Sequence, residues 1–240
     1  AADGDVVIKI DEAANNAVLV EVNSETDFVD QDGNLVAFAD AVADCALAGG
    51  VADVAVLADM PISDGEATTV NQAREALISK VGENIQVRRL VRFDNVDGKL
   101  HSYRHGVRIG VVVELEGGDE VLGRDVAMHV AASNPMCVDA DGVPAATLEK
   151  EREIFKVQAQ ESGKPADIID KIIEGRVRKF FEEVTLLGQA FVKDPDITVG
   201  NLLKQANARV IGFARMEVGE GIEKKEENFA DEVKAQMRAV

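Results

Sequence analysis

The chain reads Val20-Glu-Val-Asn-Ser-Glu-Thr-Asp-Phe-Val29 where a predicted strand gives way to a polar turn that carries a large apolar side chain, Phe28. Thr26 and Asp27 are predicted N-caps of the helix that follows, because their side-chain oxygens can accept hydrogen bonds from the free N–H groups of a first turn. Two interpretations of Phe28 stay open at this point. Either it packs into the core beside the start of the helix, or it is presented to another protein.

This passage from strand to helix belongs to a larger unit. Two short strands, Val6 to Asp11 and Ala17 to Val22, flank a turn and predict a hairpin. A helix follows, because apolar residues recur at helical spacing from Leu35 to Leu47, before the helix-ending pair Gly49-Gly50. The other predicted elements are a short helical piece at 54–58, a helix from Glu66 to Lys80 that ends at Gly82, and a strand from Ile85 to Phe93.

A second unit repeats this order of elements. Leu100 to Tyr103 is predicted to be extended, Val107 to Leu115 is a nearly unbroken β-branched run, and Glu120 to Ala132 is predicted to be a helix. Much later in the chain, Arg209 to Val218 supplies another strand. The order strand, strand, helix and later strand therefore occurs twice, which indicates an internal duplication. We expect an α+β fold with two related subdomains, each a small antiparallel sheet with helices.

Two charge-rich helices, Pro144 to Gln160 and Ala166 to Leu187, interrupt the second unit. Each carries one apolar stripe, so they are expected to pack on each other as a protruding antiparallel hairpin, or coiled coil. The exposed remainder of the stripes is expected to serve self-association or a partner. The predicted organisation is a core N-subdomain at 1–98, a core C-subdomain at 99–143 and 194–225, the hairpin at 144–193 and an amphipathic C-terminal helix module at 226–240.

Composition limits the class of partner. Lys+Arg 26 against Asp+Glu 44 gives a net charge of −18, which argues against direct binding to nucleic acid, because a phosphate backbone is bound through basic groups. No apolar run reaches membrane-spanning length and no signal peptide opens the chain, so we expect no membrane partner and a cytosolic or organellar-matrix setting, with the cytoplasm preferred. Cys45 and Cys137 are expected to be buried, reduced thiols in apolar, helix-like surroundings.

A search for catalytic chemistry returns no candidate site. His101 and His105 are four residues apart, but their β-rich flanks place them on a strand, where that separation spans about 13 Å. A metal hydrolase would need them clustered. His129 lies in an apolar helix and is expected to be a hydrogen-bonded histidine of the core or of an interface. Neither a phosphate-binding loop nor a nucleophile motif occurs. We therefore expect a binding protein that is not an enzyme and that has neither a cofactor nor a metal of its own.

Several motifs stand out in order along the chain. They are Asn23-Ser-Glu-Thr-Asp-Phe-Val29, Val81-Gly-Glu-Asn-Ile85 followed by Arg88-Arg89, Tyr103-Arg-His-Gly106 with Arg108-Ile-Gly110, Ala127-Met-His-Val-Ala-Ala132 and Glu217-Val-Gly-Glu-Gly-Ile-Glu223. This set resembles the elongation factor Ts family over essentially the whole chain. Each motif alone is modestly specific, whereas the set is highly specific. Members of that family normally begin with a small three-helix domain, so we expect this chain to be a processed, truncated or partial form.

The resemblance implies a guanine-nucleotide exchange factor that binds elongation factor Tu, GDP-bound or nucleotide-free, and promotes GDP release during translation elongation. In the family's mechanism an Asp-Phe pair wedges into the partner's G domain near its Mg²⁺ and phosphate site. By motif, that pair is Asp27 and Phe28. Further implied partner contacts are Val81, Gly82, His105 and, in the terminal helix, Phe229 and Val233. The alternative is a non-exchanging scaffold or chaperone-like partner for elongation factor Tu or a larger assembly.

Overall fold

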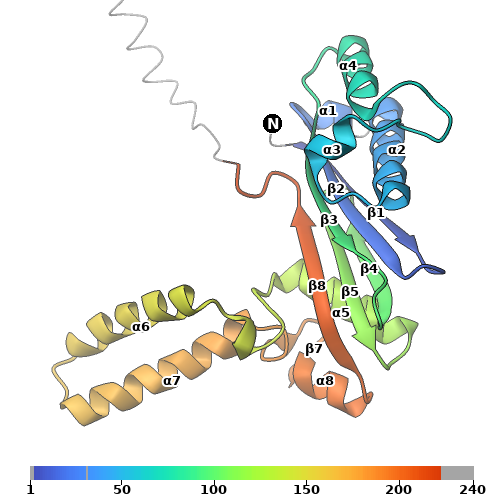
Figure 1. Ribbon diagram of the computed structural model, residues 1–240. Coiled ribbons are helices and arrows are strands. Elements are labelled where there is room, and N and C mark those ends of the chain that lie inside the picture. The colour runs from blue at the N-terminus through green and yellow to red at the C-terminus, as the bar shows by residue number, and fades with distance from the viewer. Residues whose placement is uncertain (1–2, 31, 223–240) are drawn as a thin grey trace, which may run out of the picture.

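Two three-stranded antiparallel sheets form the body of the protein, which is a computed structural model that describes residues 3–30 and 32–222 (Figure 1). The first sheet has the order β1-β2-β3 and the second has the order β4-β5-β8. Their strands are β1 (Asp3–Asp11), β2 (Asn16–Ser24), β3 (Gln86–Phe93), β4 (Lys99–His105), β5 (Ile109–Glu116) and β8 (Arg209–Glu217).

Helices fill the interval before the last strand of each sheet. Between β2 and β3 the chain forms α1 (Asp27–Asp30), α2 (Gly33–Gly49), α3 (Val54–Ala58) and α4 (Val70–Val81). Between β5 and β8 it forms α5 (Glu120–Ser133), the 3-10 turn η1 (Ala140–Gly142), α6 (Ala145–Gln160), α7 (Ala166–Val184), β6 (Ala190–Phe191), β7 (Asp194–Thr198) and α8 (Val199–Gln205). The predicted duplication and the α+β class are confirmed, because both halves place their second strand in the middle of a three-stranded meander. The small β6-β7 sheet and α8 were not predicted.

The two sheets pack face to face, and helices cover their outer faces. On β2, Val18 and Val20 point toward α2, whereas Leu19 points toward the second sheet. On β5, Val111 and Val113 point toward α5, and Val112 points back toward the first sheet. Both central strands are thus buried on two faces, which explains why their sequences are apolar runs without alternation. The approach is close: a Cβ added to Gly110 would lie 2.7 Å from the Val6 Cγ1 atom.

Two predicted helix starts were wrong. The helix after Phe28 is capped by Asp32, whose side chain accepts from the Asn34 N–H, and not by Thr26 or Asp27. Thr26 directly precedes the short helix α1 and Asp27 begins it, so the predicted caps lie before α1 and not before α2. The helix predicted from Glu66 begins at Val70, because Thr69 and Gln72 form a reciprocal capping box there. Its predicted end at Gly82 is confirmed, with φ of 77°.

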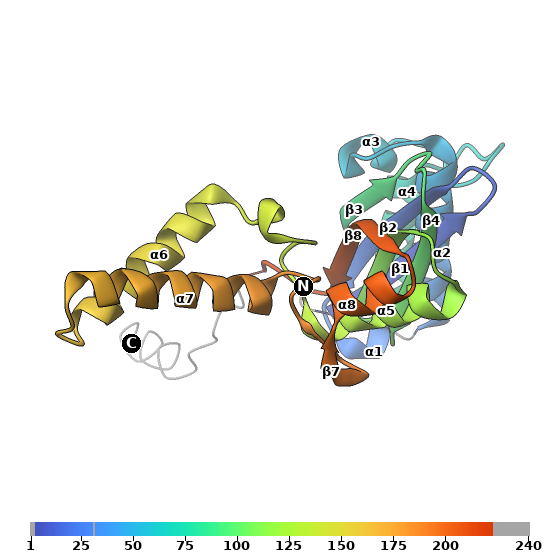
Figure 2. The same ribbon diagram turned by 90° about the horizontal axis from the view of Figure 1, so that it is seen from below.

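The helices α6 and α7 form a hairpin that extends away from both sheets (Figures 1 and 2). Between the helices, Ala159 and Val177 are buried. Arg152 Nη1 lies 2.8 Å from Glu174 Oε1, which adds a surface ion pair. The second helix ends at Val184, three residues before its predicted end, because Leu186 is drawn into the core and donates its N–H to the Cys137 carbonyl at 2.8 Å.

The two cysteines are free and differ in their surroundings. Cys45 is buried in α2 as expected. Cys137 is only half-buried and lies in an isolated bridge to Thr185, so its predicted helical setting was wrong. The predicted helix at 226–240 lies outside the described residues. Within residues 3–30 and 32–222, no helix combines the length and the hydrophobicity that a membrane span needs.

Candidate functional site

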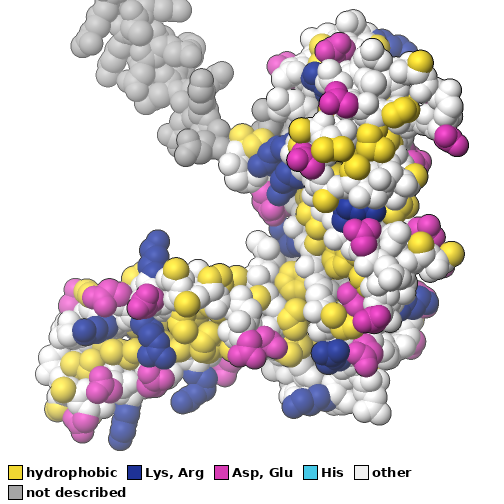
Figure 3. Space-filling model, in the orientation of Figure 1, with side chains coloured by type: hydrophobic (Ala, Val, Ile, Leu, Met, Phe, Trp, Pro, Cys, Tyr) yellow, Lys and Arg dark blue, Asp and Glu magenta, His cyan; other side chains and the backbone are white. Residues whose placement is uncertain are grey.

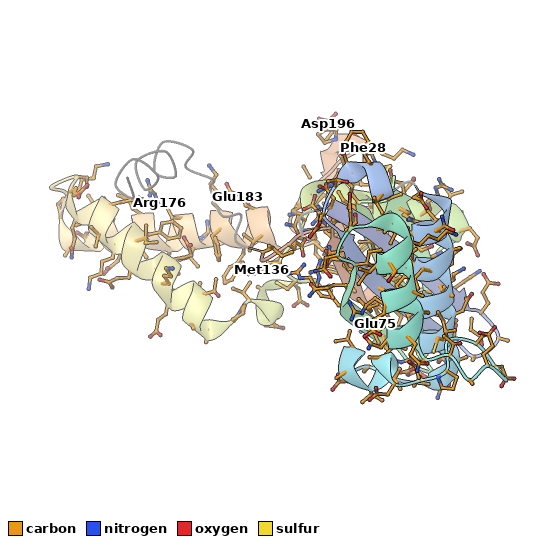
Figure 4. The ribbon with its side chains drawn as sticks, turned by 90° about the horizontal axis from the view of Figure 1, so that it is seen from above. Phe28, Glu75, Met136, Arg176, Glu183 and Asp196 are labelled. Carbon is orange, nitrogen blue, oxygen red and sulfur yellow. The ribbon has the colours of Figure 1, made fainter. Side chains whose placement is uncertain are left out.

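Phe28 is the most exposed large apolar side chain among the described residues, with 87% of its surface accessible. It lies on α1, a single helical turn, and projects away from the body of the protein (Figure 4). Its neighbour Val29 points the opposite way and packs against the core between the first sheet and its helices. Asp27 is also exposed. The turn therefore presents Asp27 and Phe28 on a short element whose inner side is fixed.

A carboxylate from the loop after α4 holds the chain just before Phe28. One oxygen of Glu83, Oε2, accepts from the backbone N–H groups of Glu25 at 3.2 Å and Thr26 at 3.1 Å. The other oxygen, Oε1, accepts from the Thr26 hydroxyl at 2.5 Å. Thr26 thus donates its hydroxyl hydrogen to Glu83. This bond, together with the cap that Asp32 supplies, explains why Thr26 does not cap α2. Because Glu83 directly follows Val81 and Gly82, these bonds place two predicted contact segments next to each other.

His105, in the third predicted contact segment, lies exposed at the end of β4, with its Nδ1 atom 3.3 Å from the Tyr103 hydroxyl. The turn that follows it is joined to the start of β1. Arg108 Nη1 lies 3.2 Å from Asp3 Oδ1, and the Val6 N–H donates to the Val107 carbonyl at 2.8 Å.

These contacts place His105 at the same end of the molecule as Phe28. Asp3 is the register partner of Ser24 at the end of β2, and the chain enters the turn that bears Phe28 directly after Ser24. The structure therefore gathers the segments of Phe28, Val81-Gly82 and His105 at one end of the paired sheets. Phe229 and Val233 lie outside the described residues.

The other two histidines, His101 and His129, are buried within the fold. His101 is buried, and a Cβ on Gly123 would lie only 2.2 Å from its ring. It is not clustered with His105, and within the described residues no group of three His, Cys, Asp or Glu side chains is arranged to hold a metal ion. His129 is fully buried between Gln189 and Val192, so the expectation of a hydrogen-bonded core histidine is confirmed.

A buried charged cluster joins the two halves of the molecule. Glu21 on β2 is fully buried and accepts from Arg88 Nη1 at 2.9 Å and Arg89 Nε at 2.5 Å, both on β3. It also accepts from the Gly219 N–H at 2.7 Å, just beyond β8. Arg89 continues the cluster by donating to the Glu217 carbonyl at 2.6 Å.

Hydrogen bonding sets the charge state of Glu21. Burial alone would raise the pKa of its carboxyl, but the bonds from Gly219, Asn23 and Arg89 outweigh burial and hold the pKa below its ordinary value. Glu21 is therefore ionised and paired across the junction of the two halves.

Sequence reasoning missed the roles of Glu83 and Glu21, although both left a signal. Glu21 is a lone acid in an apolar strand, and the Arg88-Arg89 pair interrupts another strand. Charges in strands buried on one or both faces need partners, so a pairing could have been predicted. Glu83 lies within a conspicuous motif, but its contact with Thr26 spans 57 residues and only the fold reveals it.

Comparison with known proteins matches almost the whole chain. The family model described as "Elongation factor TS" matches residues 25–220. A protein of Legionella pneumophila (strain Paris) named "Elongation factor Ts" is 56% identical over 238 residues, which are 99% of this chain and 80% of that protein. A protein of Methylococcus capsulatus with the same name is 54% identical over 239 residues, covering 100% of this chain and 81% of that protein.

Proposed function

The chain belongs to the elongation factor Ts family, and from this premise we propose that it acts as a guanine-nucleotide exchange factor, which binds elongation factor Tu and promotes GDP release during translation elongation. Such a factor works by binding and makes or breaks no covalent bond. Since exchange is a coupling between two ligands of one protein, nucleotide must weaken the hold of the factor by the same ratio by which the factor weakens the hold of nucleotide.

The finer proposal is that Asp27 and Phe28 wedge into the G domain of the partner near its Mg²⁺ and phosphate site. The observation that carries it is the 87% exposure of Phe28 on a turn that is anchored on both sides. Burying one Phe side chain at an interface is worth about 1.5–3 kcal/mol, or roughly 10- to 150-fold in affinity. That is enough to favour a displaced helix in the partner. Disturbing the bound Mg²⁺, a large local charge, would supply the rest of the free energy that weakens the hold of nucleotide.

Val81, Gly82 and His105 are proposed as further contacts of the same surface. Their support is spatial, because the Glu83 bonds and the pairing of Asp3 with Arg108 bring their loops to the end of the molecule that carries Phe28. Phe229 and Val233 are proposed contacts of the terminal segment on the strength of the family motif alone.

The proposal is tested by measuring release of labelled GDP from purified elongation factor Tu with and without this chain. We expect the wild-type chain to accelerate release and Phe28→Ala to lose at least about tenfold of that acceleration, the lower bound for one buried Phe. Val121→Ala is the matched control, because Val121 is 66% exposed but lies on α5 of the other half. Equal acceleration by wild type and Phe28→Ala would refute the wedge.

The same measurement separates the alternative, a scaffold that binds without driving exchange. Titration of elongation factor Tu with the chain would then show binding, while GDP release would keep its spontaneous rate. In that case the exchange function is wrong, and binding remains.

Two further partner assignments follow from the surface. We propose self-association through the α6–α7 hairpin. Its exposed apolar side chains include Ile154 and Val157 on α6 and Ile168 on α7. Figure 3 shows apolar side chains along this hairpin among charged ones. We propose that neither nucleic acid nor a membrane is a direct partner, which the net charge of −18 supports. The proposed location is the cytoplasm, since the bacterial relatives are elongation factors.

A further inference from the structure

We propose that Glu83 is the positioning residue of the wedge: its carboxylate fixes the turn that carries Phe28 in the orientation needed for entry into the partner. This inference rests on the proposed function, which it deepens by assigning a role to a side chain outside the partner contacts.

Glu83 anchors the turn through both of its carboxylate oxygens. A single half-buried carboxylate accepts from two consecutive backbone N–H groups and from one hydroxyl, all within residues 25 and 26. Hydrogen bonds to a charged acceptor are stronger than those between neutral groups. The Ser24 hydroxyl adds a local bond to the Thr26 carbonyl at 3.1 Å. Phe28 follows only two residues after this fixed point, so little chain is left in which its direction could vary.

The helix α1 has little stability of its own. It contains four residues, far below the length at which an isolated helix persists in water. Its orientation must therefore come from its attachments. Val29 packs beneath it, Asp32 fixes the start of α2 after it, and Glu83 fixes the chain before it. Without Glu83, the side before α1 would keep, among the described hydrogen bonds of residues 25 and 26, only local bonds to the Thr26 carbonyl, one from the Ser24 hydroxyl and one from the Val29 N–H at 3.4 Å.

The conformation of Gly82 supports the same role for Glu83. Its φ of 77° lies in the left-handed region, and a Cβ there would meet no atom within 4 Å, so glycine is required by the turn and not by crowding. The left-handed turn ends α4 and directs the next residue, Glu83, toward β2. The end of α4 and the loop after it therefore combine two proposed partner contacts, Val81 and Gly82, with the residue that orients Phe28.

An orienting role predicts a specific energetic pattern. Ordering a loose aromatic side chain and its loop on binding costs affinity that a fixed turn does not lose. Glu83→Ala is expected to reduce acceleration of GDP release by about 3- to 10-fold, the range for ordering one or two such groups. In a Phe28→Ala background, Glu83→Ala should have little further effect, because there is no wedge left to orient.

The experiment compares wild type, Glu83→Ala, Glu83→Gln, Phe28→Ala and the double variant that carries both Glu83→Ala and Phe28→Ala. Two measurements are made on each: GDP release from elongation factor Tu, and amide hydrogen exchange of the chain alone. Glu83→Ala should raise the exchange rates of the Glu25 and Thr26 amides by about tenfold or more, consistent with loss of bonds to a charged acceptor. Glu83→Gln keeps an uncharged acceptor of the same size, so its effects should be smaller in both assays. Glu75→Ala, an exposed carboxylate on α4 bonded to Asn71, is the matched control.

The outcomes separate the inference from the function on which it rests. If wild type does not accelerate GDP release, the proposed function fails, whereas the amide exchange rates still report whether Glu83 anchors the turn. If wild type is active and Glu83→Ala matches it, the inference is wrong. It is also wrong if Glu83→Ala loses as much activity in the Phe28→Ala background as in the wild type, because Glu83 would then act independently of Phe28. Should Glu83→Ala not fold, Glu83→Gln gives the same tests with a smaller expected change.

Discussion

The hydrogen bonds of His129 fix its protonation. Its Nδ1 atom accepts from the Val192 N–H at 3.1 Å, so the hydrogen must sit on Nε2, which donates to Gln189 Oε1 at 2.9 Å. This neutral tautomer satisfies both ring nitrogens inside the core. Burial lowers the pKa of His129 below its ordinary value, although the bond to Gln189 opposes part of the effect.

Stability should consequently depend on pH near the ordinary pKa of histidine. The unfolded chain binds a proton at about pH 6.5, whereas the folded chain resists protonation until a lower pH, so the free energy of unfolding falls as the pH drops below about 6.5. Urea unfolding at pH 7.5 and pH 5.5 measures the difference. His129→Gln should reduce this loss of stability. An unchanged pH dependence in His129→Gln would contradict the assignment.

For single residues, the sequence predicts which side chains have a functional role better than it predicts their contacts. Phe28 was identified because an apolar ring on a polar turn is unusual, and its exposure agrees with a role outside its own core. Glu83 lies in a conspicuous motif, but its anchoring role could not be predicted, since its partners are distant in the chain. The capping role of Thr26 was wrong for a related reason: a hydroxyl can donate as well as accept, and a nearby carboxylate decides which.

Among the elements, the α6–α7 hairpin buries apolar residues between its two helices and leaves other apolar residues exposed to solvent. Ile154 and Val157 are 40% and 48% exposed on α6. Replacing both with Ser should weaken self-association by about tenfold, since each substitution removes part of a buried aliphatic side chain from the contact. Sedimentation velocity over a range of concentrations measures this. The control is Val56→Ser on α3, which is 51% exposed and far from the hairpin in the fold. A wild-type chain that stays monomeric throughout would overturn the self-association.

Helices and strands were predictable where their periodicity was long, as in α2 and α7, whereas their ends depended on local contacts. The α4 start moved to Val70 because the Gln72 side chain accepts from the Thr69 N–H while the Thr69 side chain accepts from the Gln72 N–H. The α7 end moved to Val184 because strand-like pairing with Cys137 competes with the helix. Neither the capping bond at Thr69 nor the pairing with Cys137 can be read from the pattern of apolar residues.

For the whole molecule, the Glu21 cluster is a buried polar link between the two halves. Glu21→Gln removes the buried carboxylate that Arg88 and Arg89 share and leaves Arg89 its pair with Glu220, so we expect a loss of about 3 kcal/mol in the free energy of unfolding at neutral pH. Because the pKa of Glu21 is lowered by folding, its contribution is present above about pH 4.5 and is lost as the pH falls further. The variant should therefore show a smaller loss of stability in acid than wild type.

Denaturant unfolding between pH 7 and pH 3 provides the measurement. Glu116→Gln serves as control, because the Glu116–Arg209 pair is largely exposed and worth less than about 1 kcal/mol. If the two variants have equal stability, the cluster does not hold the halves together.

The duplication was visible in the sequence because both halves repeat one order of elements. Their face-to-face packing was not, since a strand that is buried on two faces reads the same whether a helix or a second sheet covers it. Gly110 left no separate signal, although its lack of a side chain lets β5 approach Val6. The junction at Gly219 likewise depends on contacts across 198 residues.

The late position of β8 has a consequence for synthesis of the protein. The first sheet needs only residues up to Phe93, so it can close while the ribosome is still translating the second half. The second sheet lacks its third strand until Glu217 has emerged, more than ninety residues after β5. During that interval one edge of β5, rich in valine, has no neighbour, while the α6–α7 hairpin can already form from local contacts. The nascent chain is therefore most open to mispairing late in translation, when its N-terminal half is already folded.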